Sequence, residues 1–312
     1  MLKLVLRLVW LLGATGLLGG LGIGLGLRRG YVDAFYARFA SPPAGSLVLG
    51  TSRAAQGIKP GVLATRLGGR YAGPWLNYAF TLAESPYGPG YLRSIARKLA
   101  PGTRHGLFVL AVDPWSLSLP QKALADRPLV YPEEQSMVSQ LSSVSQNPNL
   151  GYLAHYLHQP FYQLLLNTDT AHVVERLHPD GWLEIALPPP SADTALLRRR
   201  TVEKLVTYRK LAASSALAEA RFYSLRETIR FLQAHGQVVL VRLPTGCQMA
   251  ALENQYQPDF DGQMRRIADL SHVPYLTYLN QLYPTNDGNH ITRQAAEQFS
   301  QRLAADIGRQ TK

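Results

Sequence analysis

Three side chains with the chemistry of a nucleophilic enzyme lie in two short motifs near opposite ends of the chain. Ser52 belongs to the motif Gly-Thr-Ser-Arg, and Asp287 and His290 bound the motif Asp-Gly-Asn-His. A histidine can take the proton of a serine hydroxyl, while an aspartate fixes the histidine tautomer and stabilises its cationic form. These residue types together predict attack on an acyl carbonyl through an acyl-enzyme intermediate.

The serine follows a compact apolar run at residues 46–50, which is bounded by turn residues and predicts a buried strand. Ser52 then stands at the carboxyl end of that strand, near the start of the next helix. Backbone N–H groups at a helix start can bind a developing oxyanion. The alternative is that Ser52 merely caps the helix.

Asp287 and His290 follow the last predicted strand and precede the final predicted helix. Their spacing, on a turn that enters a helix, lets both side chains reach one edge of a sheet. An Asp-x-x-His pair is common by chance, and it becomes specific only together with a serine at the end of the first strand. The sequence therefore predicts a triad of Ser52, His290 and Asp287.

The elements that must position this triad alternate between strands and helices. Apolar runs predict strands at residues 46–50, 75–80, 106–112, 237–243 and 273–279. Helical patterns occupy residues 91–99, 201–235 and 292–307. Such alternation predicts a parallel sheet covered on both faces, an α/β/α three-layer sandwich of the flavodoxin-like kind with about five strands. Sites in such sheets form beyond the carboxyl ends of the strands.

Two segments do not fit this alternation. Residues 30–45 form a neck, with a short helix that ends at the prolines Pro42 and Pro43. Residues 119–197 contain several aromatics and a proline run, and we expect a mostly helical insertion that acts partly as a lid. The domain that carries the triad then spans residues 46–312.

The first 29 residues predict a transmembrane anchor. Residues 8–27 carry no charge and reach roughly 30 Å as a helix, the thickness of a hydrocarbon core. Arg28 and Arg29 follow the apolar run directly, so we expect an uncleaved single-pass anchor rather than a signal peptide. Glycines at positions 16, 20 and 24 have the spacing that lets two helices approach, which suggests a homodimer. The alternative is that glycine is simply common in membrane helices.

The composition limits the kinds of partner that the protein is expected to bind. The net charge is +11, but the basic residues are scattered, with one short arginine run, and no nucleic-acid motif is present. An anionic membrane or envelope polymer explains the charge equally well, and we expect no nucleic-acid partner. The single cysteine, Cys247, has no second cysteine with which to form an intrachain disulfide or a metal cluster. His155 and His158 lack a third ligand at suitable spacing, so we expect no metal and no cofactor.

The two motifs resemble the first and last sequence blocks of the SGNH (GDSL-like) hydrolase superfamily. They are most similar to membrane-anchored bacterial envelope members whose first block reads Gly-Ser/Thr-Ser rather than Gly-Asp-Ser. The resemblance covers residues 46–115 and 236–308. It implies that Ser52 is the nucleophile, His290 the base and Asp287 the residue that orients it, and envelope-facing members of this kind favour a soluble body on the periplasmic side. The positive charges on the two sides of the anchor nearly balance, so they leave its orientation open, and a cytoplasmic-facing membrane scaffold stays a third alternative.

The second and third blocks of the family supply a glycine and an asparagine to the oxyanion hole, and here they match poorly. Asn77 is the best candidate for a side-chain donor, although a turn-forming role suits it equally. Val-Asp-Pro-Trp stands where Gly-x-Asn-Asp is expected, and its Asp113 either lines the site or caps the following turn. Arg53 either contacts an acidic substrate or pairs with a surface carboxylate.

Two functions follow from these observations. The first is a membrane-tethered serine esterase or O-acyltransferase that acts on an acylated envelope glycan or a lipid-linked substrate. The second keeps the fold and the anchor but loses the chemistry, as a degenerate binding or assembly factor of the cell envelope. The intact triad favours the first, and the poor second and third blocks favour the second.

Overall fold

Five short strands form one parallel sheet, in the order β2-β1-β3-β8-β9. The structure is a computed structural model that describes residues 2–28, 32–125, 129–157, 174–186 and 194–310. The strands of the sheet are β1 (Ser46–Leu49), β2 (Trp75–Asn77), β3 (Gly106–Ala111), β8 (Gly236–Arg242) and β9 (Tyr275–Thr277). All four neighbouring pairs are parallel, so every carboxyl end lies at the same edge.

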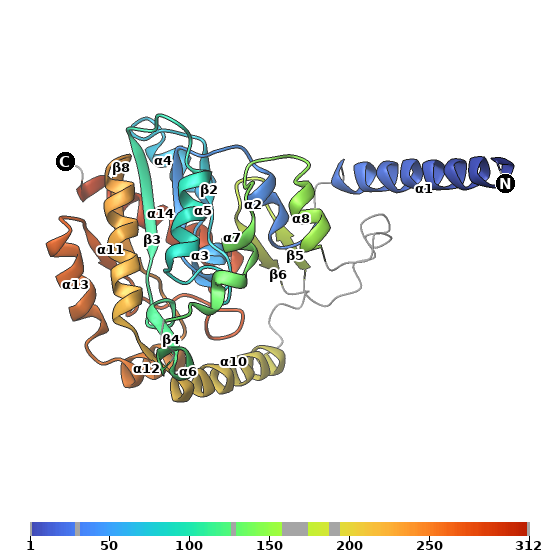
Figure 1. Ribbon diagram of the computed structural model, residues 1–312. Helices are drawn as coiled ribbons and strands as arrows, with labels where there is room; N and C mark the ends of the chain where they lie inside the picture. The colour runs from blue at the N-terminus through green and yellow to red at the C-terminus, as the bar shows by residue number, and fades with distance from the viewer. Residues whose placement is uncertain (1, 29–31, 126–128, 158–173, 187–193, 311–312) are drawn as a thin grey trace.

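Alternate side chains of the strands pack against helices on opposite faces, because the side-chain period of a strand is two residues. Phe108 and Leu110 of β3 belong to one core cluster, and Leu107 and Val109 belong to the other. The first face is covered by α5 (Pro89–Lys98), α11 (Glu219–Gln233) and α13 (Phe260–Leu270). The second is covered by α3 (Ser52–Gly57), α4 (Pro60–Leu67) and α14 (Arg293–Gln310). The predicted three-layer α/β/α sandwich is confirmed (Figure 1).

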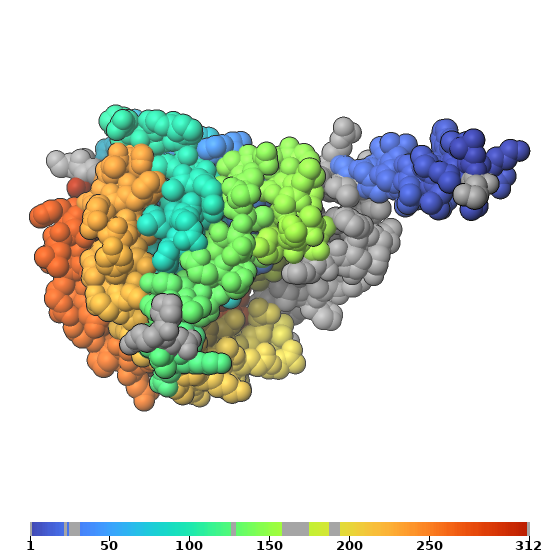
Figure 2. Space-filling model, in the orientation of Figure 1, coloured from blue at the N-terminus to red at the C-terminus, as the bar shows by residue number. Residues whose placement is uncertain are grey.

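The region predicted as a helical insertion is of mixed structure where the structure describes it. It contains β4 (Ser118–Pro120), α6 (Gln121–Ala125), the 3₁₀ helix η2 (Pro132–Gln135), α7 (Met137–Gln140), α8 (Leu150–His155), β5 (Val174–Leu177) and β6 (Leu183–Ala186). β5 and β6 form an antiparallel hairpin. Val138 and Tyr152 are fully buried in the same core cluster as α5, so this part of the insertion belongs to the body (Figure 2).

The long helix expected at residues 201–235 is interrupted. It consists of α10 (Thr194–Ser214), the strand β7 (Ser215–Leu217) and α11. β7 pairs antiparallel with β4, and this pairing at a distance overrides the local helical pattern. Two helices that the sequence did not predict, α12 (Cys247–Tyr256) and α13, follow β8.

The N-terminal segment divides into an apolar helix and a short neck. α1 (Leu2–Arg28) is long and apolar enough to cross a membrane by length and composition, and none of its apolar window is buried in the protein. Figure 1 shows it lying apart from the body. In the neck, α2 (Tyr36–Ala40) buries Phe39 completely, and Ser41 ends it before Pro42.

Candidate active site

Ser52 reaches the edge of the sheet through a sharp change of direction after β1. Gly50 has a φ of +134°, and a Cβ there would lie 2.8 Å from that of Ala111 on the neighbouring strand. Glycine is therefore required for both the backbone conformation and the close approach. Thr51 occupies the cap position of α3, and Ser52 is the first residue of the helix. The alternative of Ser52 as a helix cap is thus not what the structure contains.

The turn after β9 places Asp287 and His290 at the same edge. Asp287 Oδ1 accepts hydrogen bonds from the backbone N–H groups of Asn289 and His290, so the aspartate folds its own loop. Gly288 has a φ of +75°, and its carbonyl accepts a hydrogen bond from the Thr245 hydroxyl beyond β8. The loop is thereby fixed from within and from the neighbouring strand.

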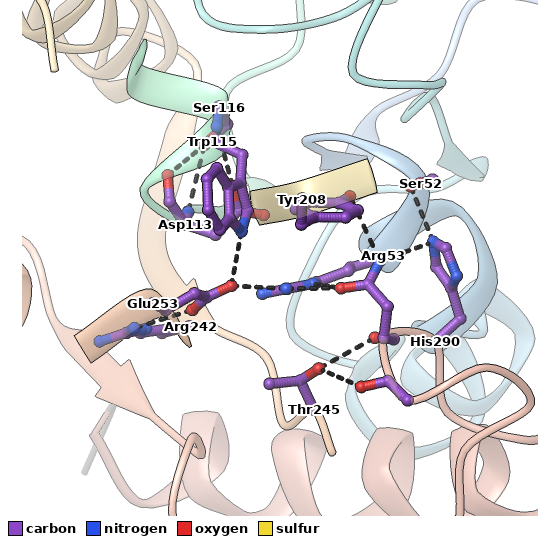
Figure 3. Close-up of polar contacts among 12 residues, drawn as sticks. Ser52, Arg53, Asp113, Trp115, Ser116, Tyr208, Arg242, Thr245, Glu253 and His290 are labelled. Carbon is purple, nitrogen blue, oxygen red and sulfur yellow. Dashed lines mark hydrogen bonds and ion pairs between the residues drawn. The ribbon is translucent and has the colours of Figure 1, made fainter. Parts of the chain in front are cut away.

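The three predicted side chains form a continuous chain of hydrogen bonds. His290 Nε2 lies 2.9 Å from Ser52 Oγ (Figure 3). His290 Nδ1 lies 2.9 Å from Asp287 Oδ2. Because a carboxylate only accepts, Nδ1 carries the proton and Nε2 is free to accept the one on Ser52. This arrangement allows the imidazole to activate the hydroxyl.

The electrostatics of the turn keep Asp287 ionised. Burial by itself raises the pKa of the Asp287 carboxyl, but the hydrogen bonds and charge of His290 outweigh it, and Lys204 adds to their effect. The pKa therefore lies well below its ordinary range. Lys204 of α10 approaches to 3.5 Å from Asp287 Oδ2. The carboxylate is thus charged at neutral pH, as the orienting partner of an imidazole must be.

Asn77 is not a donor to this site. Its side chain is fully buried, and its Nδ2 donates to the carbonyl oxygens of Ala54 and Ile58 at 2.8 and 2.9 Å. Its Oδ1 accepts from the backbone N–H of Ala79. Both ends of the amide are therefore engaged in joining β2 to α3, and the oxyanion role expected for Asn77 is wrong.

Arg53 lies inside the protein rather than in a substrate cleft. Only 4% of it is exposed, and its Nη2 forms an ion pair with Glu253 Oε1 at 2.5 Å. Its Nε and Nη2 donate to Asn289 Oδ1. Burial by itself lowers the pKa of Arg53, but the charges of Glu253 and Asp113 outweigh it and raise the pKa. Arg53 thus pairs with a carboxylate, as one of the two expectations had it, but this carboxylate is fully buried rather than at the surface.

Asp113 lies beyond the carboxyl end of β3, where it is buried and its Oδ1 accepts from the backbone N–H of Ser116. This hydrogen bond is the turn-capping role expected as one alternative. Burial also raises the pKa of the Asp113 carboxyl, and the charge of Arg53 opposes that effect.

Several residues around the triad were missed by sequence reasoning. Glu253 on α12 is fully buried and accepts from Trp115 Nε1 and from Arg242 Nη2, both at 2.8 Å. Tyr208 of α10 lies 3.3 Å from Asn289 Nδ2. Only Asn289 carried a signal, since it stands inside the Asp-Gly-Asn-His motif.

No metal cluster is found in the part of the chain that the structure describes: no three His, Cys, Asp or Glu side chains gather there as ligands. Of the two histidines considered as ligands, His155 ends α8, and His158 lies outside the described residues.

Comparisons with known proteins add one structural neighbour. No protein-family model and no curated protein matches the chain. Among solved structures, the chain is similar to Est24, a carbohydrate acetylesterase from Sinorhizobium meliloti, with a TM-score of 0.39 and 10% sequence identity. The match covers 85% of this chain and 99% of that one. The fold and the site of the present chain rest on the geometry described above.

Proposed function

We propose that the protein is a membrane-tethered serine esterase or O-acyltransferase of the SGNH kind. The observation that carries this proposal is the hydrogen bond of 2.9 Å between Ser52 Oγ and His290 Nε2, with Asp287 behind the imidazole. Each of the three roles of a triad has a side chain at the right distance. The position beyond the carboxyl ends of parallel strands supports the same conclusion.

The reaction proceeds in two halves. Ser52 Oγ attacks the carbonyl carbon of an ester while its proton passes to His290 Nε2. The bond from that carbon to the leaving oxygen then breaks, and His290 returns the proton to the leaving alcohol. In the second half, water or a sugar hydroxyl loses its proton to His290 and attacks the acyl carbon. The bond from that carbon to Ser52 Oγ then breaks, and His290 returns the proton to Ser52. Water gives hydrolysis, and a sugar hydroxyl gives transfer.

The substrate class follows from the surroundings of the body. α1 is apolar enough to hold the protein at a membrane, and the net charge of +11 suits an anionic surface. We therefore propose an O-acylated envelope glycan or lipid-linked substrate on the extracytoplasmic side of the membrane. The second candidate is a binding or assembly factor with the same fold. The engagement of Asn77 in the core favours it, because this side chain then provides no oxyanion donor.

The test is covalent labelling of the full-length protein, in detergent, with a fluorophosphonate probe of activated serines. We expect the wild type to label, Ser52→Ala not to label, and His290→Ala to label at least about 100-fold more slowly, because the loss of a general base costs a factor of this order.

Two control variants lie at the opposite edge of the sheet. Ser46→Ala changes the other end of β1, and His235→Ala changes the residue before β8. Both should label as the wild type does. A folded wild type that never labels would refute the enzyme and favour the binding factor, which glycan-binding assays would then examine.

A further inference from the structure

Asn289 lies between the two halves of the triad. Its Oδ1 accepts hydrogen bonds from Nε and Nη2 of Arg53, at 2.8 and 2.6 Å. Its Nδ2 lies 3.3 Å from the hydroxyl of Tyr208 and 3.2 Å from Nε2 of His290. The residue therefore joins the helix that carries Ser52 to the base that activates it.

Arg53 determines which way round the Asn289 amide lies. A guanidinium has only donors, so the amide atom that faces it must be the oxygen. Two donors converge on that oxygen, and rotation of the amide by half a turn would place an NH₂ group against them. Nδ2 is thus held toward His290 and Tyr208.

Arg53 is itself held by buried partners. Glu253 Oε1 pairs with its Nη2, and the other carboxylate oxygen pairs with Arg242 Nη2. Trp115 Nε1 donates to the same Oε1 atom that binds Arg53. Figure 3 shows the Arg53 guanidinium lying between Glu253 on one side and the loop of His290 on the other. The ion pair is screened little by solvent, because Glu253 is fully buried and only 4% of Arg53 is exposed.

The consequence concerns the state of the base. A donor that faces Nε2 stabilises the neutral imidazole, in which Nε2 is an acceptor, and disfavours the cation. Asp287 acts in the opposite sense on Nδ1. Asp287 and Asn289, which lie in the same turn as His290, therefore hold its two ring nitrogens in different roles. Nδ1 is a donor to Asp287, and Nε2 is an acceptor toward Ser52.

We propose that Asn289, oriented by Arg53, is a positioning residue of the triad that keeps Nε2 of His290 a proton acceptor directed at Ser52. This inference rests on the proposed function, in which His290 is the base.

Among the described residues, the charged or titratable groups on the elements packed around the His290 turn include Asp287 on that turn, Arg53 on α3, and Arg200, Lys204 and Tyr208 on α10. Burial raises the pKa of Tyr208 to about 12, so its phenol stays neutral over the range of the test.

The test compares pH profiles of fluorophosphonate labelling for full-length variants in detergent. Asn289→Asp replaces the donor by an acceptor of the same shape, which favours the protonated imidazole. The acidic limb of the labelling rate should therefore move to higher pH, by about one unit. Asn289→Ala removes the donor to His290 together with the acceptor of Arg53, without placing a new acceptor at Nε2, and should move the limb in the same direction by less. Arg53→Lys keeps the positive charge beside Glu253 but loses the two guanidinium donors that bind Asn289 Oδ1. Its pH midpoint of labelling should lie between those of Asn289→Ala and the wild type.

The matched control is Arg221→Met. Arg221 is also a buried arginine in an ion pair, with Glu133, and the pair makes no contact with the triad. This variant should lower Tm and leave the midpoint of the pH profile unchanged. The proposal would be overturned if the pH midpoints of both Asn289 variants coincided with that of the wild type.

A second readout separates this inference from the proposed function. In full-length protein labelled with ¹³C at histidine Cε1, NMR titration follows His290 directly, and its signal is assigned by its absence in His290→Gln. An upward shift of its titration midpoint in Asn289→Asp supports the inference even if the wild type proves unreactive, and an unchanged midpoint refutes it. An unreactive wild type refutes only the proposed function.

Discussion

At the scale of the residue, the number of partners that a polar atom already has determines whether it can take part in chemistry. Ser52 is the first residue of α3 and Asn77 of β2 donates to the same helix, but the two differ in this respect. The Asn77 amide binds four backbone groups and is fully buried. The Ser52 hydroxyl instead faces an imidazole whose nitrogen can take its proton. The Asn77 side chain is fully used in holding β2 to α3, whereas the Ser52 hydroxyl is free to serve as the nucleophile of the proposed function.

Asn77 should therefore matter for stability. Asn77→Ala removes the donor to the Ile58 carbonyl and the acceptor of the Ala79 N–H, so these two buried backbone groups lose a partner, whereas the Ala54 carbonyl keeps the N–H of Ile58. We expect the free energy of unfolding to fall by about 3 kcal/mol, the cost of such unsatisfied groups together. Urea denaturation measures this loss, and exposed Asn254→Ala on α12 is the control. The folded variant should still label at Ser52; abolished labelling with unchanged stability would contradict this assignment.

The triad was predictable from the sequence because each of its motifs is local and adjoins an apolar run. Asp287 and His290 lie in one turn, and Ser52 follows β1 directly. The environment of Arg53 was not predictable, because its partners Glu253 and Asn289 are far away in the chain. Glu253 moreover lies on α12, whose sequence shows no clear periodic pattern of apolar residues.

At the scale of the element, the strands were easier to predict than the helices. A buried parallel strand is a short, nearly continuous apolar run, and β1, β3 and β8 have this pattern. The segment that contains α10, β7 and α11 reads as a single amphipathic helix, because its interruption depends on a partner elsewhere. Ser215 and Leu217 pair with β4, which no local pattern reveals.

The end of α5 carries a buried lysine that connects three segments. Lys98 Nζ donates to the carbonyl oxygens of Ser41 in the neck and Val144 in the insertion, at 2.5 and 2.7 Å. Burial lowers the pKa of Lys98 from 10.5 to about 7. Between pH 7 and pH 10.5, the Lys98 ammonium therefore keeps its proton in the unfolded chain but has lost it in the folded protein.

Stability should accordingly rise with pH across that window and stay flat below it. Between pH 7 and 9, we expect the free energy of unfolding of the wild type to rise by about 2 kcal/mol more than that of Lys98→Met. Denaturant unfolding at several pH values measures the difference. Lys122→Met, at an exposed position of α6, should show no such trend, and parallel curves for wild type and Lys98→Met would contradict the assignment.

At the scale of the whole molecule, the exposed apolar helix α1 lies next to the folded body. No part of the apolar window of α1 is buried by the protein, so a bilayer is the environment that would satisfy it. We predict that the full-length protein stays in the membrane fraction after an alkaline wash and that its mass retains residues 1–29. A chain shortened at the amino end would instead identify a cleaved signal sequence. A reporter fused after Lys312 would determine on which side the body lies.

The positions of Ser52 and His290 along the chain determine when, under the proposed function, the serine can become reactive. Ser52 follows the first strand of the sheet and His290 follows the last, 238 residues later. Synthesis begins at the amino end, so the hydroxyl emerges long before the imidazole that is to activate it. A serine without a base is a weak nucleophile. Under the proposed function, the nascent chain is therefore inert toward esters until the turn that follows β9 has been synthesised and has joined the sheet.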